Sequence, residues 1–431
     1  MPDSTHLYDV IVVGGGPAGC ATALSLTKND APAGLRVLVL DDAEQNAFKI
    51  GESLPASARR TLAMLHPTLN ERLAVDTAQG LHHMCTGNAS AWAGPHLEET
   101  YALMNPYGHG WHLGRARFDE ALREACGPLL RKGKAVDVRR VDGRGDQAHC
   151  WEIDATMSST GETETFRARW IVDATGRKAS IARKLGAKVR KHSDLLAFYA
   201  LFTTTEPETD TDNRTLIEAA PSGWWYSARL PHGRRLVTYT TSPTDTTARV
   251  ARTAAGFQDK LRRETVHIAR ALEQDGVPAY EMAAESRFVS HTSACSAVLE
   301  PYAAWEPAPA GPDGASDTSS GRGWCAVGDA ALAFDPLSSQ GIITALNTGA
   351  FLGGVLARQL GIVEPPTSGE EVDGVRAVCA IHDAYEQVRV MYDEGRAYYY
   401  SIVDRFEADT IGSEDKNSVD SSFWKKMQVT L

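Results

Sequence analysis

Short apolar runs and a helical pattern alternate along the start of the chain. Tyr8–Val13 (YDVIVV) is rich in β-branched residues, which is typical of a parallel strand that is buried on both faces. Cys20–Leu26 (CATALSL) has the pattern of a helix, and Arg36–Leu40 (RVLVL) is a second buried strand. The order strand, helix, strand predicts an α/β unit with a parallel sheet.

The middle of the chain has a different pattern, in which short apolar segments lie between turn residues. Trp224–Leu230 and Arg235–Ser242 flank Pro231-His-Gly-Arg, which predicts a β-hairpin. Two further strands and one helix are predicted here, at Leu196–Thr204, Val289–Val298 and Thr253–Gly276. The segments between residues 195 and 290 therefore predict an antiparallel sheet.

Strands and helices of the first type return on both sides of this region. Trp170–Ala174 and Gly323–Val327 are predicted strands, and Phe118–Cys126 and Val375–Glu407 are predicted helices. Glu306–Gly321 is rich in Pro, Gly and Ser and is predicted to be a loop. Tyr385 and Tyr392 are seven residues apart in the last helix, a spacing that favours core packing.

Composition excludes several classes of protein. The chain has 431 residues, enough for about two or three domains, and its 44 basic and 55 acidic residues give a net charge of −11. An acidic surface repels phosphate, so no nucleic-acid partner is expected. The seven cysteines contain no C-x-x-C pair, which predicts no metal site and favours a cytoplasmic protein with reduced thiols. Two uncharged stretches contain glycine, proline or polar residues, so no membrane span is expected.

A glycine-rich motif connects the first predicted strand to the first helix. Gly14-Gly-Gly-Pro-Ala-Gly19 matches G-x-G-x-x-G, and Asp41 follows at the end of the second strand. Gly14 allows a tight turn, Gly16 lets the backbone approach a pyrophosphate, and Gly19 lets the helix pack closely. The helix N-terminus favours phosphate, and Asp41 can accept hydrogen bonds from ribose hydroxyls. The segment therefore predicts a dinucleotide site.

A second motif lies about 300 residues further along the chain. Gly328-Asp329 follows the strand Gly323–Val327 and leads into an Asp335-Pro-Leu-Ser-Ser-Gln-Gly341 turn. The helix after this turn carries small residues at every fourth position, namely Gly341, Ala345, Gly349 and Gly353. A ridge of small residues lets a helix approach its neighbours closely. The free N–H groups at the start of this helix carry a partial positive charge, which suits an electron-rich, partly anionic ligand.

Together these motifs resemble the FAD-dependent monooxygenase superfamily of the p-hydroxybenzoate-hydroxylase type, in the branch that holds the flavin-dependent halogenases. The resemblance implies that Asp329 contacts the flavin ribityl chain and that the Asp335–Ile342 turn passes beside the isoalloxazine ring. Gly51-Glu-Ser53, Arg115 and Trp170–Gly176 resemble further FAD-binding segments, although Gly114 replaces the usual Asp before the arginine. The implied FAD contacts are Gly14, Gly16, Pro17, Ala18, Gly19, Asp41, Glu52, Ser53, Arg115, Asp173, Gly176, Gly328, Asp329, Pro336, Ser339, Gly341 and Ile342.

The resemblance implies an α/β, Rossmann-like FAD-binding domain with an inserted antiparallel-sheet substrate domain and a helical C-terminal region. The motif positions make the FAD domain discontinuous, with predicted segments 1–80, 106–190 and 286–365. The predicted substrate domain comprises residues 81–105 and 191–285, and the C-terminal region comprises residues 366–431.

Three kinds of reaction are open to such a flavoprotein. Reduced flavin and O2 give a C4a-hydroperoxide, which can transfer oxygen or oxidise halide; other relatives are oxidases, dehydrogenases or non-catalytic flavoproteins. The halogenases carry Trp-x-Trp-x-Ile-Pro and a catalytic Lys. Here Trp224-Trp-Tyr-Ser-Ala-Arg-Leu-Pro231 lacks that spacing, and Gly80–Gly94, the segment expected to supply the Lys, contains none. The sequence therefore favours a monooxygenase, with a halogenase as the alternative.

Two short motifs indicate the class of substrate. Gly87-Asn-x-Ser-x-Trp92 and Asn105–His112 resemble a non-halogenating subgroup that oxygenates tryptophan during tryptophylquinone maturation. The resemblance implies an indole, tryptophan-like or phenolic substrate, either free or attached to a peptide or carrier. The candidate pocket residues are Trp92, Trp224, Trp225 and Tyr226, for which core packing is the alternative.

Candidate bases and electron donors complete the predictions. His109 and His112 precede Arg115 and are candidate catalytic bases on an indole N–H or a phenol, although packing roles are equally open. No second G-x-G-x-x-G lies between the FAD motifs, so no separate NAD(P)H domain is expected. NAD(P)H would then deliver electrons directly or through a partner flavin reductase.

Overall fold

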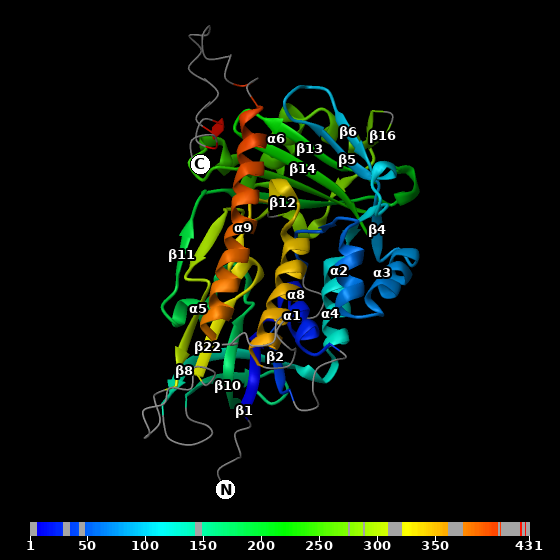
Figure 1. Cartoon of the computed structure of the whole chain (residues 1–431). Coiled ribbons are helices and arrows are strands. Elements are labelled where there is room, and N and C mark those ends of the chain that lie inside the picture. Colours follow the sequence, from blue (N-terminus) through cyan, green and yellow to red (C-terminus); the bar gives the residue numbers. More distant parts are fainter. Residues whose placement is uncertain are drawn as a thin grey trace, which may run out of the picture.

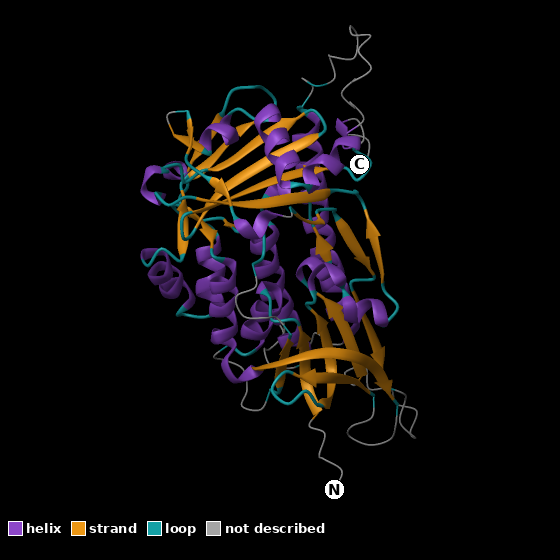
Figure 2. Cartoon of the chain, turned by 180° about the vertical axis from the view of Figure 1, so that it is seen from behind, coloured by secondary structure: helices purple, strands orange, loops and turns teal. Residues whose placement is uncertain are grey.

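The structure is a computed structural model with two large sheets. It describes residues 7–28, 35–42, 48–142, 149–274, 276–287, 289–308, 321–360, 374–403, 406, 423, 424 and 427. Most of the predicted loop Glu306–Gly321 and of the predicted C-terminal region beyond residue 403 lies outside these residues. Figures 1 and 2 show the two large sheets at opposite ends of the molecule, with several helices between them.

The first large sheet has seven strands in the order β1-β2-β8-β9-β10-β22-β21, and β10 also pairs with β1. Its strands are β1 (Leu7–Val13), β2 (Val37–Asp41), β8 (Leu130–Val141), β9 (Cys150–Met157), β10 (Thr163–Asp173), β21 (Ala303–Pro307) and β22 (Gly321–Ala326). β1 pairs in parallel with both β2 and β10, and β10 pairs in parallel with β22. These contacts confirm the predicted parallel strands and place the two glycine motifs after β1 and β22, the strands on either side of β10.

The second large sheet has eight strands in the order β18-β12-β15-β14-β13-β5-β6, with β19 also paired to β12. Its strands are β5 (Gly87–Ala91), β6 (Glu98–Tyr101), β12 (Leu196–Thr203), β13 (Thr215–Ala220), β14 (Gly223–Leu230), β15 (Arg234–Thr241), β18 (Glu281–Met282) and β19 (Ser290–Ser293). The predicted hairpin is confirmed as β14 and β15, whose pairing is antiparallel. Only β13 and β5 pair in parallel within the described part of this sheet.

Smaller sheets and the helices connect these two layers. The smaller sheets are β11 (Lys188–Lys191) with β20 (Ala297–Glu300) and β23 (Leu332–Ala333), β3 (Ser53–Leu54) with β7 (Gly110–Leu113) and β4 (His82–Cys85), and β16 (Glu273–Gln274) with β17 (Val277–Pro278). The helices are α1 (Pro17–Leu26), α2 (Ala58–Leu65), α3 (Leu69–Ala78), α4 (Arg115–Cys126), α5 (Ser180–Lys184), α6 (Ala254–Glu264), α7 (His267–Ala271), α8 (Gly341–Gln359) and α9 (Gly374–Ser401). α8 and α9 both span the region between the parallel sheet and the antiparallel sheet (Figure 1).

The small residues of α8 lie directly against α1. A Cβ added to Gly349 would lie 2.5 Å from the carbonyl oxygen of Ala18, and one added to Gly353 would lie 2.7 Å from that of Thr22. The predicted ridge therefore exists and sets how closely the two glycine motifs approach. α8 is also the one described helix that is long and apolar enough to cross a membrane, but 61% of its apolar window is buried in the protein. Its apolar character is explained by this packing.

Two predicted elements differ from the structure. Val289–Val298 is not one strand, because β19 and β20 belong to different sheets and residues 294–296 connect them. Thr253–Gly276 is not one helix; α6 ends at Glu264, α7 follows, and β16 begins at Glu273. Apolar spacing alone does not reveal such breaks. The predicted domain boundaries stay a prediction.

Candidate cofactor and substrate site

A cavity of about 380 Å³ lies between the two large sheets, where both sets of predicted functional segments meet. Its size is within the range of ligand-binding pockets. The side formed by the parallel sheet and its helices includes Gly16, Pro17, Ala18, Arg115, Gly176, Arg177, Asp329, Pro336, Ser339, Gly341 and Ile342. The opposite side includes Ala197, Trp224, Tyr226, Leu236, Thr238, Thr240 and Thr292, and Glu52 and Ser53 lie at one edge.

Three glycines leave open space on the cofactor side of the cavity. A Cβ added to Gly16, Gly176 or Gly341 would meet no atom within 4 Å. α1 begins at Pro17 without a side-chain cap, so its free N–H groups lie beside Gly16. A helix N-terminus with backbone that a ligand can approach suits a phosphate. On these two observations, the residues present fit a flavin dinucleotide.

The other two glycines of the first motif have packing roles. Gly14 has a φ of 110°, which favours glycine, and an added Cβ would lie 2.3 Å from the carbonyl oxygen of Ala174. A Cβ on Gly19 would lie 1.9 Å from the carbonyl oxygen of Gly14. Gly14 therefore lets the turn pack against Ala174, Gly19 lets α1 pack against the turn, and neither lines the cavity.

Asp41 is already bonded within the protein. Its Oδ1 accepts a hydrogen bond from the Gly15 N–H at 2.9 Å, and its Oδ2 accepts one from Arg123 Nε at 2.9 Å. The carboxylate is 7% exposed. It therefore fixes the glycine-rich turn, and its predicted contact with ribose stays a prediction.

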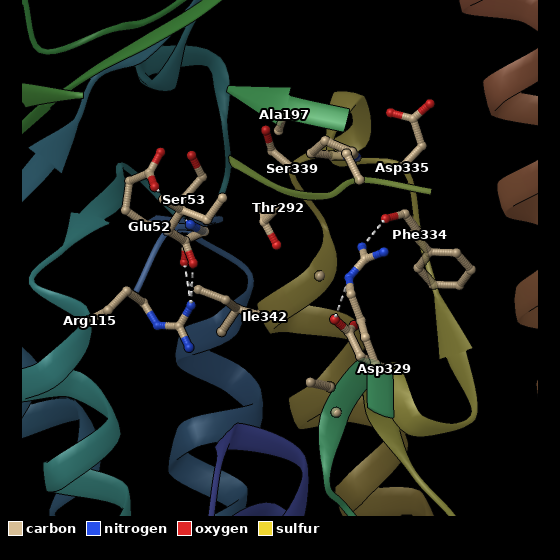
Figure 3. Close-up of a pocket in the computed structure, with 18 of the residues that line it drawn as sticks. Glu52, Ser53, Arg115, Ala197, Thr292, Asp329, Phe334, Asp335, Ser339 and Ile342 are labelled. Atoms are coloured by element: carbon tan, nitrogen blue, oxygen red, sulfur yellow. Dashed lines mark hydrogen bonds and ion pairs between the residues drawn. The ribbon is translucent and has the colours of Figure 1, made fainter. Parts of the chain in front are cut away.

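Arg115 holds the turn at the edge of the cavity. Its Nη1 donates to the carbonyl oxygens of Ile50 at 3.1 Å and Gly51 at 2.7 Å. Asp119, one turn later on α4, accepts two further bonds from the same guanidinium at 3.2 Å each. Figure 3 shows Arg115 on one side of the cavity and Asp329 on the other. The Gly51-Glu52 turn is thus fixed by an arginine that is itself paired.

Arg177 joins three segments on the opposite side. It donates to the carbonyl oxygens of Cys295 at 2.5 Å and Phe334 at 2.7 Å, and its Nε lies 3.4 Å from Asp329 Oδ2. The Asp329 side chain is 38% exposed towards the cavity. Desolvation raises the pKa of Asp329, and the charge of Arg177 opposes that rise. Sequence reasoning quoted Arg177 within its motif but did not assign it to the site.

Helix α9 fixes the Asp335 turn. The Asp335 N–H donates to Tyr392 Oη at 2.7 Å, and Tyr400 Oη donates to Asp335 Oδ2 at 2.7 Å. Burial raises the pKa of Asp335, while its hydrogen bonds and nearby Arg396 lower it. Trp224 Nε1 donates to Tyr400 Oη at 3.1 Å, so this helix links the turn to the opposite wall. Tyr385 and Tyr392 pack in the core, as predicted.

One tryptophan and three small side chains form the floor of the cavity on the antiparallel sheet. Trp224, Thr240, Ala197 and Thr292 are direct neighbours across β14, β15, β12 and β19. Because side chains of neighbouring residues in a strand point to opposite faces, these four share the cavity face. The Oγ1 of Thr240 is buried and has no hydrogen-bond partner among the described residues. Sequence reasoning missed both threonines, because only the cross-strand register brings them together.

Glu52, Ser53 and Tyr226 form a hydrogen-bonded cluster at the cavity edge. Tyr226 Oη donates a short hydrogen bond to Glu52 Oε1 and lies 2.8 Å from Ser53 Oγ. The other oxygen of Glu52 accepts from the Gly51 N–H at 2.9 Å. Burial raises the pKa of Glu52 and raises that of Tyr226 well above its usual range. The cluster joins the turn of the cofactor side to the opposite wall.

Several predicted site residues lie away from the cavity. Trp225 points to the opposite face of its sheet, where its Nε1 donates to Glu264 Oε2 at 3.0 Å. Trp92 packs edge-on against Trp224, with 6.3 Å between the ring centroids. Asp173 accepts N–H bonds from Thr175, Ile181 and Ala182, so its carboxylate fixes a loop. Gly328 is buried beside Asp329.

Neither candidate histidine reaches the cavity. His112 is fully buried, its Nε2 lies 2.9 Å from Thr215 Oγ1, and burial lowers its pKa to about 3. His109 lies beside Arg59 and Trp111, at 3.3 Å from the arginine Nη2. The structure gives no support to a catalytic base at either position, because neither His112, which lies in β7, nor His109, which precedes it, lines the cavity.

Comparisons with known proteins agree with this site. A sequence model of the FAD-dependent oxidoreductase family matches residues 9–197. LodB of Marinomonas mediterranea, named as an FAD-dependent oxidoreductase, is 28% identical over 341 residues, which span 78% of this chain and 80% of LodB. The chain is thus similar to FAD-dependent oxidoreductases, which are flavoprotein enzymes.

Solved structures define the fold within that class. CmlS, a flavin-dependent halogenase, matches with a TM-score of 0.73 and 19% identity, over 99% of this chain and 68% of CmlS. QhpG, a peptidyl tryptophan dihydroxylase essential for tryptophylquinone cofactor biogenesis, matches with a TM-score of 0.62 and 19% identity, over 98% of this chain and 79% of QhpG. The chain therefore has the fold of the flavin-dependent halogenases and their relatives, as its motifs predicted.

Proposed function

We propose that this protein is an FAD-dependent monooxygenase that hydroxylates an electron-rich aromatic ring. The observation that carries the proposal is the cavity itself, which has open glycine backbone on one side and an aromatic and polar sheet face on the other. One wall suits a flavin dinucleotide and the other suits a flat, polar-edged substrate. Both walls line the same cavity.

The cofactor would be held from several segments. The N-terminus of α1 beside Gly16 would bind the phosphates. Asp329 would accept hydrogen bonds from the ribityl hydroxyls, and the turn from Asp335 to Ile342 would lie beside the flavin ring. When bound and reduced, FAD supplies the electrons that activate O2. The protein contributes position, hydrogen bonds and exclusion of water.

The cations of the cavity favour oxygen transfer over halogenation. Among the described residues that line the cavity, the cationic side chains are Arg115 and Arg177, and no lysine is present. Both guanidinium groups are already bonded to backbone carbonyls and carboxylates. Neither offers the free amine that would capture hypohalous acid. Oxygen would therefore pass directly to a substrate carbon.

The substrate would be an indole, a tryptophan-like ring or a phenol. Trp224 and Tyr226 provide faces against which an aromatic ring can pack. QhpG acts on a peptidyl tryptophan, as its name states, and this supports a substrate that is either free or attached to a peptide or carrier. Halogenation, the activity named for CmlS, is the second candidate.

Electrons would come from NAD(P)H, either by direct docking or through a partner flavin reductase. A cytoplasmic location would suit the seven cysteines, none of which forms a disulfide in the described part of the chain. The test of the proposal is turnover of the reduced holoenzyme with O2 and either phenol or indole, in buffers with and without chloride and bromide. We expect a hydroxylated product at the same rate in every buffer. A halogenated product, or turnover that requires halide, would refute the proposal and promote the second candidate.

A further inference from the structure

The cavity contains an acid–base pair that sequence reasoning did not identify. We infer that Tyr226 and Glu52 take up the proton of the substrate's aromatic O–H or N–H during the reaction. The inference rests on the proposed function and names the substrate class for the same site. It replaces the two histidines, which the structure places elsewhere.

The position of the Tyr226 hydroxyl carries the argument. It donates to Glu52 Oε1 and lies 2.8 Å from Ser53 Oγ. A phenolic oxygen can still accept another hydrogen bond, because it has one proton and two lone pairs. Tyr226 and Ser53 both line the cavity, so their hydroxyl groups lie at the edge of the space where a substrate would bind.

The surroundings favour Glu52 as the final proton acceptor. Burial raises its pKa, which makes the carboxylate a stronger base, while Arg115 and two hydrogen bonds keep the charged form accessible. The groups that face the pair are Arg115 from α4, Ser53 from β3 and the Cys85 thiol from β4 near Tyr226. No other base lines the cavity at this edge within the described chain.

The proton transfer balances without any further reactant. The substrate O–H or N–H bond breaks and its proton forms a bond to Tyr226 Oη, while the Tyr226 proton moves to Glu52 Oε1. The substrate becomes an electron-rich anion, and Glu52 becomes a neutral acid. After oxygen insertion the reverse path returns the proton to the same substrate atom. Tyr226 touches the substrate and is the catalytic residue, whereas Glu52 acts through it and is a positioning residue.

A second feature of the wall supports a polar ligand. Thr240 is fully buried and lines the cavity, and its Oγ1 has no hydrogen-bond partner among the described residues. Buried hydroxyls in proteins are usually bonded, so an unpaired hydroxyl on a residue that lines the cavity is consistent with a polar ligand there. Thr240 lies on β15 beside Trp224, on the same face as Tyr226. An aromatic ring with a polar edge would fit against this face.

The test is a comparison of matched ligands that differ only in the transferable proton. Phenol with anisole, and indole with N-methylindole, are titrated into the oxidised holoenzyme by ligand-detected NMR. We expect the wild type to bind the O–H or N–H ligand about tenfold more tightly than its methylated partner, as for a hydrogen bond to a charge-assisted acceptor. Tyr226→Phe should reduce that preference to near one. Tyr239→Phe is the control, because this buried tyrosine bonds to Ser222 and Asp245 on the other face of the sheet.

A second readout separates positioning by Glu52 from mere structural support. In the wild type the preference should fall as the pH drops through the raised pKa of Glu52, since the neutral acid is a much weaker acceptor than the carboxylate and no longer polarises the Tyr226 hydroxyl. Glu52→Gln should show a reduced preference that does not change with pH in that range. FAD content should be equal in all variants.

Three results would overturn the inference. Equal binding of the paired ligands to the wild type, or no measurable binding of either, would exclude a proton-accepting pair at this wall. Loss of FAD in Tyr226→Phe would assign the hydroxyl to the cofactor. These binding measurements involve no oxygen chemistry, so a halogenated product in turnover would refute the proposed function and leave this result standing.

Discussion

Replacing Gly16 by alanine separates cofactor binding from folding. Gly16 has φ −80° and ψ −176°, an extended backbone that alanine adopts without strain. An added Cβ meets no protein atom within 4 Å and projects towards the cavity that Gly16 lines. The substitution therefore changes only the surface that a pyrophosphate would approach.

The magnitude follows from the bonds that a methyl group would displace. A hydrogen bond from a backbone N–H to a charged phosphate contributes about 1.5–3 kcal/mol, so its loss should weaken FAD binding by roughly 10- to 150-fold. The FAD-free protein should keep its stability or gain up to about 1 kcal/mol, because alanine reduces the entropy of the unfolded chain. Fluorescence titration with FAD and thermal unfolding of the FAD-free protein measure the two quantities.

Two further glycines serve as matched controls. Gly395→Ala adds a Cβ to α9 with no atom within 4 Å, so FAD affinity should stay at the wild-type value. Gly19→Ala places its Cβ 1.9 Å from the Gly14 carbonyl oxygen and should disrupt the fold itself. If Gly16→Ala binds FAD as tightly as the wild type, the phosphates do not lie over this turn and the placement of the cofactor is wrong.

Three other substitutions test the site and its scaffold. Burial raises the pKa of Glu52, so the folded state disfavours its charged form. Glu52→Gln should therefore raise the melting temperature relative to the wild type at pH values above that raised pKa, and the difference should disappear once the pH falls below the pKa of Glu52 in the unfolded chain. A difference in thermal scans that does not change with pH would contradict this sign. Asp329→Ala should weaken FAD retention on gel filtration about tenfold or more, through loss of charge-assisted hydrogen bonds, and unchanged retention would remove Asp329 from the cofactor site. Gly349→Val should lower the free energy of unfolding in urea by about 2 kcal/mol or more, because its Cβ would lie 2.5 Å from the Ala18 carbonyl oxygen. Unchanged stability would mean that α1 and α8 are less closely packed than the structure shows.

Local patterns predicted the parts of the fold that depend on neighbours in sequence. The buried runs of β1 and β2, the glycine motif between them and the small-residue ridge of α8 all appear where their patterns indicate. The hairpin of β14 and β15 follows from its turn residues, and His232 and Gly233 both have a φ of 64° there. These features are encoded within a few residues of one another.

Contacts between distant segments could not be predicted in the same way. Glu52 and Tyr226 are 174 residues apart, and their hydrogen bond depends on how β3 approaches β14. Asp41 has the position expected for a ribose contact, yet Arg123, 82 residues later, already occupies one of its oxygens. His112 was a candidate base because it precedes Arg115 in the sequence, but the register of β7 with β3 and β4 buries it.

The central claim is that oxygen from O2 passes to an aromatic substrate in the cavity between the two sheets. The most direct measurement is mass spectrometry of the product that forms when the reduced holoenzyme reacts with isotopically labelled dioxygen, in the presence of indole or phenol and bromide. We predict a hydroxylated product that carries the label and contains no bromine. An unlabelled hydroxyl group, or a brominated ring, would contradict the account.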